Sequence, residues 1–305
     1  MYMIRTDLAL ESHEIAQAKG AVDGVLSEET KNGEVTVTKV TVLNENGAKT
    51  IGKPVGTYVT VEASGLFEAG DEVYENALSS VANELVNMLK NVKNGLVLVA
   101  GLGNSLMTPD ALGPRTVENI LVTRHIAGEL CKIEGLEGMR PVAAIAPGVL
   151  GQTGVETGEI IYALVQKIQP TVVIVVDALS SRRASRLGNT IQISDTGITP
   201  GSGIGNSRFA INSETLGVPV ISIGVPTVVD AATLVIDVLE GAGIPANQTD
   251  EQKIKSSIEP GGLTMFVTPR LVDLVIEHAA KLTGMAINRA LHPTISKENI
   301  AMLVN

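Results

Sequence analysis

The sequence is poor in aromatic residues and cysteine, and it has no long apolar run. Aromatic residues make up 2% of the 305 residues, so the core must be built from Val, Ile, Leu and Ala. The single cysteine, Cys131, excludes an internal disulfide and is typical of a reducing compartment. No stretch approaches the roughly 20 apolar residues of a membrane helix, and the first residues have no apolar signal-peptide core. We therefore expect a soluble, cytoplasmic protein.

Several catalytic and binding motifs are also absent. There is no GxSxG nucleophile elbow, and the four histidines show neither an HExxH pattern nor paired ligand spacing. The loop Gly101–Pro114 fails the dinucleotide pattern GxGxxG because Leu106 occupies the sixth position, and no Walker lysine follows. The net charge of -10 argues against direct binding to nucleic acid or to an anionic membrane. We accordingly expect neither a cofactor nor a bound metal.

What the sequence does contain is typical of an α/β protein. Apolar residues make up 44% of the chain, and continuous aliphatic runs alternate with helical patterns. This alternation indicates buried parallel strands joined by right-handed crossovers. Two alternating segments, Val35–Leu43 and Tyr58–Ala63, indicate a small N-terminal antiparallel β element. We predict a single α/β domain over residues 1–305, with a mostly parallel twisted sheet flanked by helices.

The same patterns predict the main elements. Residues 1–30 are polar and are expected to be irregular. The predicted buried strands are Gly95–Ala100, Val142–Ala146, Thr171–Val176, Thr190–Ile193 and Val218–Ile223. The predicted helices are Asp71–Val92, Pro114 to about Ile126, a helix ending near Gln169, Asp230–Leu239 and Thr268–Leu291. Because sites in open α/β sheets form at the carboxyl ends of strands, we expect a site in the loops after the first three buried strands.

Two aspartates lie at these strand ends. Asp110 belongs to the loop after the first buried strand and precedes a predicted helix, so a helix N-cap is an equally good interpretation. Asp177 directly follows the run TVVIVV, where it either belongs to a site or bonds loop amides. Two carboxylates that face one cleft share a proton, because both cannot ionise cheaply. The ionised one then takes a proton from water and the neutral one protonates the scissile carbonyl or the leaving amine, which suffices for peptide hydrolysis.

Other polar and glycine-rich positions are candidates for a substrate cleft. Asn104, Gly148 and Gly201 lie in glycine-rich loops. Asp195 opens an Asp-Thr-Gly tripeptide like that of pepsin-like proteases, but those proteins are β-rich, so an Asx-turn is the simpler interpretation. We predict that these four residues line the cleft.

Several segments resemble the germination proteases of spore-forming bacteria, and they run through most of the chain in the family's order. The segments are IRTDLALE (Ile4–Glu11), GLGNSLMTPDALGP (Gly101–Pro114), VENILVTRH (Val117–His125), APGVLGQTGVET (Ala146–Thr157), VVDALSSR (Val175–Arg182), TIQISDTGITPGSGIGN (Thr190–Asn206), GVPVISIGVPTVVDA (Gly217–Ala231) and MFVTPRLVD (Met265–Asp273). The loop with PDALGP is also similar to that of hydrogenase-maturation endopeptidases. This second similarity implies a shared phosphorylase- or hydrolase-like scaffold.

The resemblance implies an atypical aspartic endopeptidase that acts without a metal. Its two catalytic aspartates would be Asp110 and Asp177. Its substrates would be small acid-soluble spore proteins of the spore core, cleaved after an acidic residue. A cationic subsite would favour that residue, and the candidates are Arg182, Arg183 and Arg186, with a solvated helix face as the alternative.

The resemblance also implies a homotetrameric zymogen that removes its own N-terminal peptide. The matching bond is Asp7–Leu8, so residues 1–7 are the predicted propeptide, which is very short. The stretch after Ala231 is shorter than in familiar members and lacks most of a polar insertion. Two other interpretations stay open: a metal-dependent maturation endopeptidase on the same scaffold, and a non-catalytic binding protein.

Overall fold

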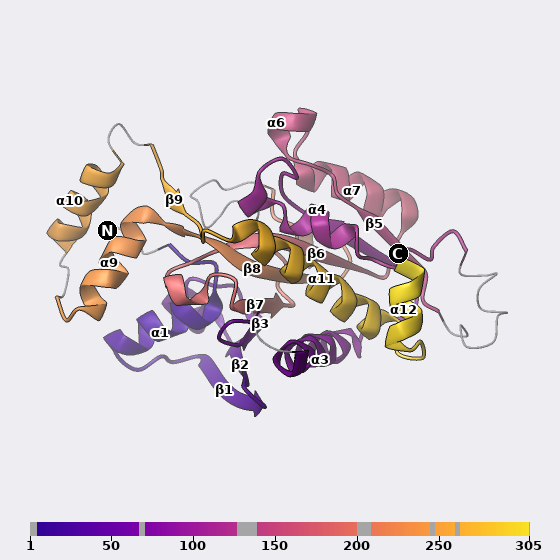
Figure 1. Ribbon diagram of the computed structural model, residues 1–305, viewed down its shortest axis with the longest axis horizontal. Coiled ribbons are helices and arrows are strands. Elements are labelled where there is room, and N and C mark those ends of the chain that lie inside the picture. Colours follow the sequence, from indigo (N-terminus) through magenta and orange to yellow (C-terminus); the bar gives the residue numbers. More distant parts are fainter. Residues whose placement is uncertain are drawn as a thin grey trace.

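The computed structural model describes residues 5–66, 71–126, 139–199, 209–244, 248–259 and 263–304. In these residues one mixed sheet is covered by helices (Figure 1). The strands are β1 (Val25–Asn32), β2 (Val35–Val42), β3 (Gly56–Glu62), β4 (Val97–Gly101), β5 (Val142–Ile145), β6 (Val172–Ser181), β7 (Thr190–Ser194), β8 (Val220–Asp230) and β9 (Phe266–Val267). The helices are α1 (Ala9–Lys19), α2 (Glu45–Ile51), α3 (Asp71–Leu89), α4 (Leu112–Val117), α6 (Leu150–Thr153), α7 (Thr157–Ile168), α8 (Ser213–Leu216), α9 (Ala231–Gly241), α10 (Gln248–Ile258), α11 (Val272–Leu291) and α12 (Lys297–Val304), with 3-10 turns η1 (Thr108–Asp110) and η2 (Ala184–Arg186).

The sheet joins a parallel half to an antiparallel half. Its strand order is β1-β2-β3-β7-β8-β6-β4-β5, and β9 pairs with β8. Neighbouring strands in the run β5-β4-β6-β8 are parallel, as aliphatic strands separated by helices predict. The other pairs are antiparallel, and they include the pairs of β7 with β3 and with β8. The predicted α/β class is confirmed, and the antiparallel element is larger than predicted because β7 joins it to the main sheet.

Two aliphatic layers cover the two faces of the parallel half. Successive strand residues point to opposite faces, so each buried strand supplies both layers. One layer packs β4 and β6 against α3 and α11, and the other packs them against α7. A separate cluster packs α1 and α2 on β1, β2 and β3. None of the helices in the described part of the chain is both long and apolar enough to cross a membrane.

Two predictions of local structure were wrong. Residues 1–30 are not irregular throughout, because they contain α1 and β1. The helix predicted from Pro114 to about Ile126 is α4, which ends at Val117. Beyond it, the backbone amides of Thr123 and Arg124 both donate to the carbonyl oxygen of Val142 at the start of β5. Bonding to the sheet edge therefore replaces the later turns of the predicted helix.

The third predicted buried strand is longer than expected. β6 does not end before Asp177 but continues to Ser181. It pairs with β8 along this whole length, with an irregularity between Leu179 and Ser180. Its other neighbour, β4, ends at Gly101, which pairs with Val176. The polar end of β6 therefore extends past β4, and its backbone is bonded there by other segments.

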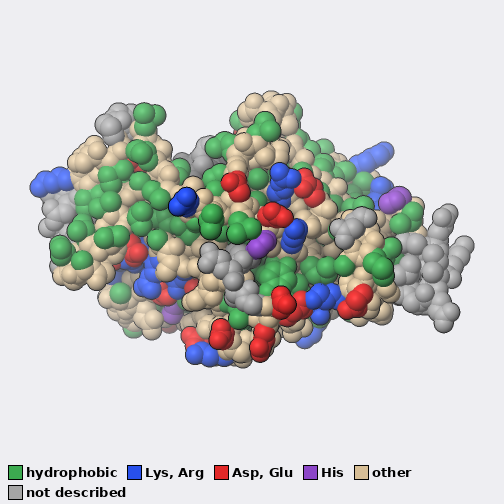
Figure 2. Space-filling view, in the orientation of Figure 1, with side chains coloured by type: hydrophobic (Ala, Val, Ile, Leu, Met, Phe, Trp, Pro, Cys, Tyr) green, Lys and Arg blue, Asp and Glu red, His purple; other side chains and the backbone are tan. Residues whose placement is uncertain are grey.

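Exposed apolar side chains gather at the end of the molecule formed by α9 and β9 (Figure 2). They include Val238, Leu263 and Met265, which are all more than half exposed. Apolar surface of this kind is common where proteins bind one another.

Candidate active site

Asp110 is held beside the sheet by a tightly closed loop. The loop follows β4 and stays next to β6, because the Leu102 amide donates to the Val176 carbonyl oxygen at 2.8 Å. Gly103 has a φ of +111°, and a Cβ there would lie 2.0 Å from the carbonyl oxygen of Asp110. The Asn104 amide donates to Asp110 Oδ2 at 2.8 Å. The glycine turn thus folds the loop back so that the Asp110 carboxylate is bonded by its own loop.

The interpretation of Asp110 as a helix cap is wrong. Asp110 is the last residue of η1, and the N-cap position of α4 is Ala111. The Thr227 hydroxyl on β8 donates to the carbonyl oxygen of Pro109 at 2.7 Å, which fastens η1 to the sheet. Asp110 is therefore positioned by the sheet rather than by the helix that follows it.

Asp177 is a buried carboxyl group in the middle of β6. It is 8% exposed, and its Oδ1 accepts a hydrogen bond from the Ala178 amide at 2.9 Å. Burial raises the pKa of Asp177 well above its ordinary value, and the negative charges of Asp110 and Asp7 raise this pKa further. The Ala178 hydrogen bond opposes the rise. Two residues far apart in sequence, Asp110 and Asp177, therefore interact electrostatically.

The N-terminal segment lies against this site. The Asp7 amide donates to the Ser180 carbonyl oxygen at 2.8 Å, and the Ser180 amide donates to Asp7 Oδ2 at 2.8 Å. The Asp7 carbonyl oxygen accepts hydrogen bonds from Lys53 Nζ at 2.9 Å and from Gln192 Nε2 at 3.2 Å. Leu8, the next residue, is completely buried. The peptide bond between Asp7 and Leu8 is thus fixed on both sides, and the charge of Asp7 acts on Asp177.

A cavity adjoins this segment. Its volume is about 270 Å³, and its lining includes Asp7, Lys53, Tyr58, Gln192 and Asn212. It lies between the N-terminal segment, the loop after α2 and strands β7 and β8. One side of the segment around Asp7 therefore faces the cavity.

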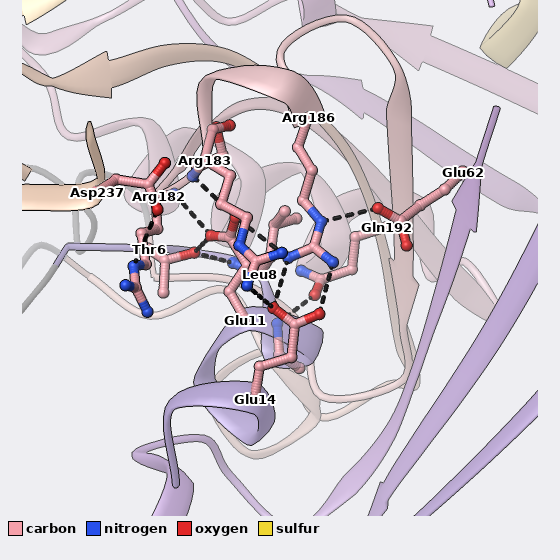
Figure 3. A network of polar contacts seen from close by, with 12 residues as sticks. Thr6, Leu8, Glu11, Glu14, Glu62, Arg182, Arg183, Arg186, Gln192 and Asp237 are labelled. Carbon is pink, nitrogen blue, oxygen red and sulfur yellow. Dashed lines mark hydrogen bonds and ion pairs between the residues drawn. The ribbon is translucent and has the colours of Figure 1, made fainter. Parts of the chain in front are cut away.

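An ionic network anchors α1 to the end of β6 (Figure 3). Arg186 is 8% exposed and pairs with Glu11 at 3.3 Å, Glu14 at 2.7 Å and Glu62 at 2.7 Å. Burial lowers the pKa of Arg186, but the hydrogen bonds to Glu14 and Glu62 outweigh it and raise the pKa. The solvated-face interpretation is therefore wrong for Arg186, which is a buried structural cation.

The other two arginines are also paired with acidic residues of this chain. Arg182 pairs with Asp237 at 3.6 Å and with Glu240, while Arg183 pairs with Glu14 at 3.7 Å. The backbone amides of both arginines donate to the carboxylate of Glu11, at 2.6 and 3.0 Å. These contacts position the end of β6 against α1 and α9.

Comparisons of the whole sequence with known proteins identify its family. The germination protease family matches residues 4–242. The chain is 43% identical to a germination protease of Clostridium perfringens over 100% of both chains. It is 42% identical to one from Caldanaerobacter subterraneus, over 99% of this chain and 98% of that protein. It is 40% identical to one from a Geobacillus species, over 98% of this chain and 96% of that protein.

The chain belongs to the germination protease family. It is therefore a protease, a hydrolase of peptide bonds. Among solved structures, a NiFe hydrogenase maturation protease, HycI, from Thermococcus kodakarensis is 18% identical. That alignment covers 67% of this chain and 98% of HycI, with a TM-score of 0.35.

In this germination protease, two of the predicted cleft residues tie neighbouring loops together. The side-chain oxygen of Asn104 accepts a hydrogen bond from Gln152 Nε2 at 2.6 Å. Gln152 lies in α6, and a Cβ on Gly148 would meet its side chain at 3.1 Å. Gly148 has a φ of +78°, which favours glycine. The loops after β4 and β5 are thus joined beside the site.

Of the remaining predicted positions, Asp195 lies next to the cavity, whose lining includes its neighbours Ser194 and Thr196. Asp195 Oδ1 accepts a hydrogen bond from the Thr57 amide at 2.8 Å, across from the start of β3. Gly201 lies outside the described residues. Within the ranges that the structure describes, no group of three or more His, Cys, Asp or Glu side chains is arranged to hold a metal ion.

Sequence reasoning missed Lys53 and Gln192. Lys53 follows α2 in a loop without a recognised motif. Gln192 did carry a signal, because it is a polar residue at the centre of the apolar strand TIQIS and is 9% exposed. A buried glutamine in a strand must find hydrogen-bond partners, and here one of them is Asp7.

Proposed function

We propose that this germination protease starts the degradation of small acid-soluble spore proteins, cleaving after acidic residues with Asp110 and Asp177 as its catalytic pair. The observation that carries the proposal is the raised pKa of Asp177, which comes from burial and from the charge of Asp110. Paired carboxylates with separated proton affinities are the arrangement that acid–base hydrolysis requires. Family membership supplies the protease activity on which the proposal builds.

The two carboxylates take different roles in this mechanism. Asp177 carries the shared proton, because burial favours its neutral form. Asp110 is the ionised partner, and the Asn104 amide at 2.8 Å favours that charge. Asp110 accepts a proton from the attacking water as the water oxygen bonds to the scissile carbonyl carbon. Asp177 gives its proton to the leaving amine as the carbon–nitrogen bond breaks.

We also propose that the protease is a zymogen that cuts its own Asp7–Leu8 bond. The support is the position of Asp7, whose charge acts on Asp177 and whose carboxylate is bonded by the Ser180 amide. Asp7 is itself an acidic residue before a bond, so the chain's own segment matches the proposed specificity. The proposed working form is a homotetramer in the spore core, and the exposed apolar side chains of α9 and β9 are consistent with assembly.

The test is digestion of a basic spore protein by Asp110→Asn, Asp177→Asn and the wild type. We expect the wild type to cut at glutamyl bonds and both variants to lose the activity while keeping the wild-type circular dichroism spectrum. Glu28→Gln removes an exposed carboxylate on β1 and serves as the matched control that stays active. Normal cleavage by either aspartate variant would refute the carboxylate pair, and loss of wild-type activity in a chelator would favour a metal-dependent reaction.

A further inference from the structure

Two side-chain donors converge on the carbonyl oxygen of Asp7, the residue whose charge acts on Asp177. Lys53 Nζ lies 2.9 Å and Gln192 Nε2 lies 3.2 Å from the carbonyl oxygen of Asp7. The donors come from different elements, since Lys53 follows α2 and Gln192 lies in β7. The oxygen belongs to the peptide bond between Asp7 and Leu8. The carbonyl of the bond proposed for self-cleavage therefore has two donors already in place.

Gln192 is oriented for this contact by a second hydrogen bond. Its Oε1 accepts a hydrogen bond from the Ala9 amide at 2.7 Å, so its NH₂ group faces the carbonyl oxygen of Asp7. The glutamine is 9% exposed, so bulk water competes little with either contact. It thus bonds the backbone on both sides of Leu8 (Figure 3).

Lys53 brings a positive charge to the same oxygen. It is half-buried, and besides the Asp7 contact it donates to the carbonyl oxygen of Thr6 at 3.3 Å. Burial lowers the pKa of Lys53 below its ordinary value, and the negative charges of Asp7 and Glu11 oppose this shift only in part. A cation in a partly water-excluded site stabilises a developing negative charge far more than it would in water.

We propose that Lys53 and Gln192 form the oxyanion-binding site of this protease. The inference rests on the proposed function, because it takes Asp7–Leu8 as a bond that is cut. When the water oxygen bonds to the carbonyl carbon, the carbonyl electron pair moves to the oxygen, where Lys53 and Gln192 hold it. When the pair returns, the carbon–nitrogen bond breaks and Asp177 protonates the amine of Leu8. Because Lys53 and Gln192 stabilise the oxygen, Asp177 does not have to protonate the carbonyl and keeps its proton for the leaving amine.

The experiment compares the full-length wild type with Lys53→Met, Gln192→Glu and Lys39→Met. Gln192→Glu keeps the shape and the acceptor for the Ala9 amide but removes the donor to Asp7. Lys39→Met removes an exposed lysine of β2 and is the charge-matched control. Mass spectrometry follows the appearance of a chain that begins at Leu8, and a glutamyl peptide measures kcat and KM in trans. Circular dichroism and thermal unfolding confirm the fold of each variant.

We expect kcat to fall about 100- to 1000-fold in Lys53→Met and in Gln192→Glu, with KM little changed, because oxyanion donors act mainly in the transition state. Lys39→Met should match the wild type, and Lys53→Arg, which keeps a charged donor, should retain more activity than Lys53→Met. If Lys53→Met does not fold, Gln192→Glu decides the question.

Different results would separate the two proposals. Absence of cleavage in the wild type and in Lys39→Met would refute the proposed function itself. Wild-type cleavage that persists unchanged in Gln192→Glu would overturn the oxyanion site and leave the proposed function standing. Faster self-cleavage in the variants, or a change confined to KM, would also overturn it, because it would mean that the pair only anchors the N-terminal segment.

Discussion

Replacing Asp177 by asparagine should stabilise this protease at neutral pH. The carboxyl group is buried near two like charges, and its pKa in the folded chain is well above the ordinary value of 3.8. Between these two values the unfolded chain has lost the proton and the folded chain still holds it. Stability of the wild type therefore falls as pH rises, by at most about 1.4 kcal/mol per pH unit for one proton. Asparagine removes this penalty, and its side-chain oxygen still accepts the hydrogen bond from the Ala178 amide.

The size of this stability difference follows from the difference between the folded and unfolded pKa values of Asp177. Each unit by which the folded pKa exceeds the unfolded pKa costs the wild type about 1.4 kcal/mol once the pH is above both. A displacement of even one unit makes Asp177→Asn more stable by that amount at pH 7. At pH 3, where both states of the wild type are protonated, the two proteins should differ little.

Urea unfolding at a series of pH values measures this gap. We expect the difference between Asp177→Asn and the wild type to widen steadily from pH 4 upward and to level off above the folded pKa. Glu28→Gln controls for the loss of one negative charge at an exposed position. A variant that is less stable than the wild type at pH 7, or a gap that does not depend on pH, would refute the reasoning.

Three further outcomes are expected. Arg186→Met should lower the unfolding free energy by about 3 kcal/mol in urea titrations, because it leaves the fully buried carboxylate of Glu11 without its ion pair, and unchanged stability would show that the network contributes nothing net. Gly103→Ala should lower the unfolding free energy by at least about 2 kcal/mol, since its Cβ would meet a backbone oxygen at 2.0 Å and a φ of +111° strains alanine. Gly151→Ala, at a helical position with open space around it, should change stability by less than about 1 kcal/mol, and equal losses in the two thermal unfolding curves would contradict the steric argument. The kcat for a glutamyl peptide should decline as pH rises through the raised pKa of Asp177, whereas a rate that keeps rising with pH would exclude this group as the acid.

The parallel core could be predicted from sequence because its signal is local. A few consecutive residues are enough to predict burial in the aliphatic runs of β4 and β6 and in the helical spacing of α3. The segments missed in residues 1–30 carry no such pattern. β1 has a single buried residue, Val25, because it is an edge strand. α1 is held by the burial of Ala9 and Leu10 and by the contacts of Glu11 with the segment after β6 and with η2. Tertiary contacts of this kind leave no periodic trace in the sequence.

The candidate site was predictable only in part, for a related reason. Asp110 and Asp177 stand out because strand ends in an α/β sheet are marked by topology. The strand with Asp177 nevertheless continues past it, since pairing with β8 extends beyond the apolar run. Lys53 and Gln192 meet only when the N-terminal segment, the loop after α2 and β7 come together, so their convergence on one oxygen cannot be derived from local spacing.

The two hydrogen bonds between Ser180 and Asp7 use only main-chain atoms of Ser180. Its carbonyl oxygen accepts from the Asp7 amide, and its amide donates to the Asp7 carboxylate. If substrates occupy the same place, the backbone amide of a strand residue contributes to selectivity for an acidic residue. An alanine scan of the cleft would leave that contribution intact and miss it. Replacing the amide of residue 180 by an ester would remove it, because the ester lacks that donor while every side chain stays the same.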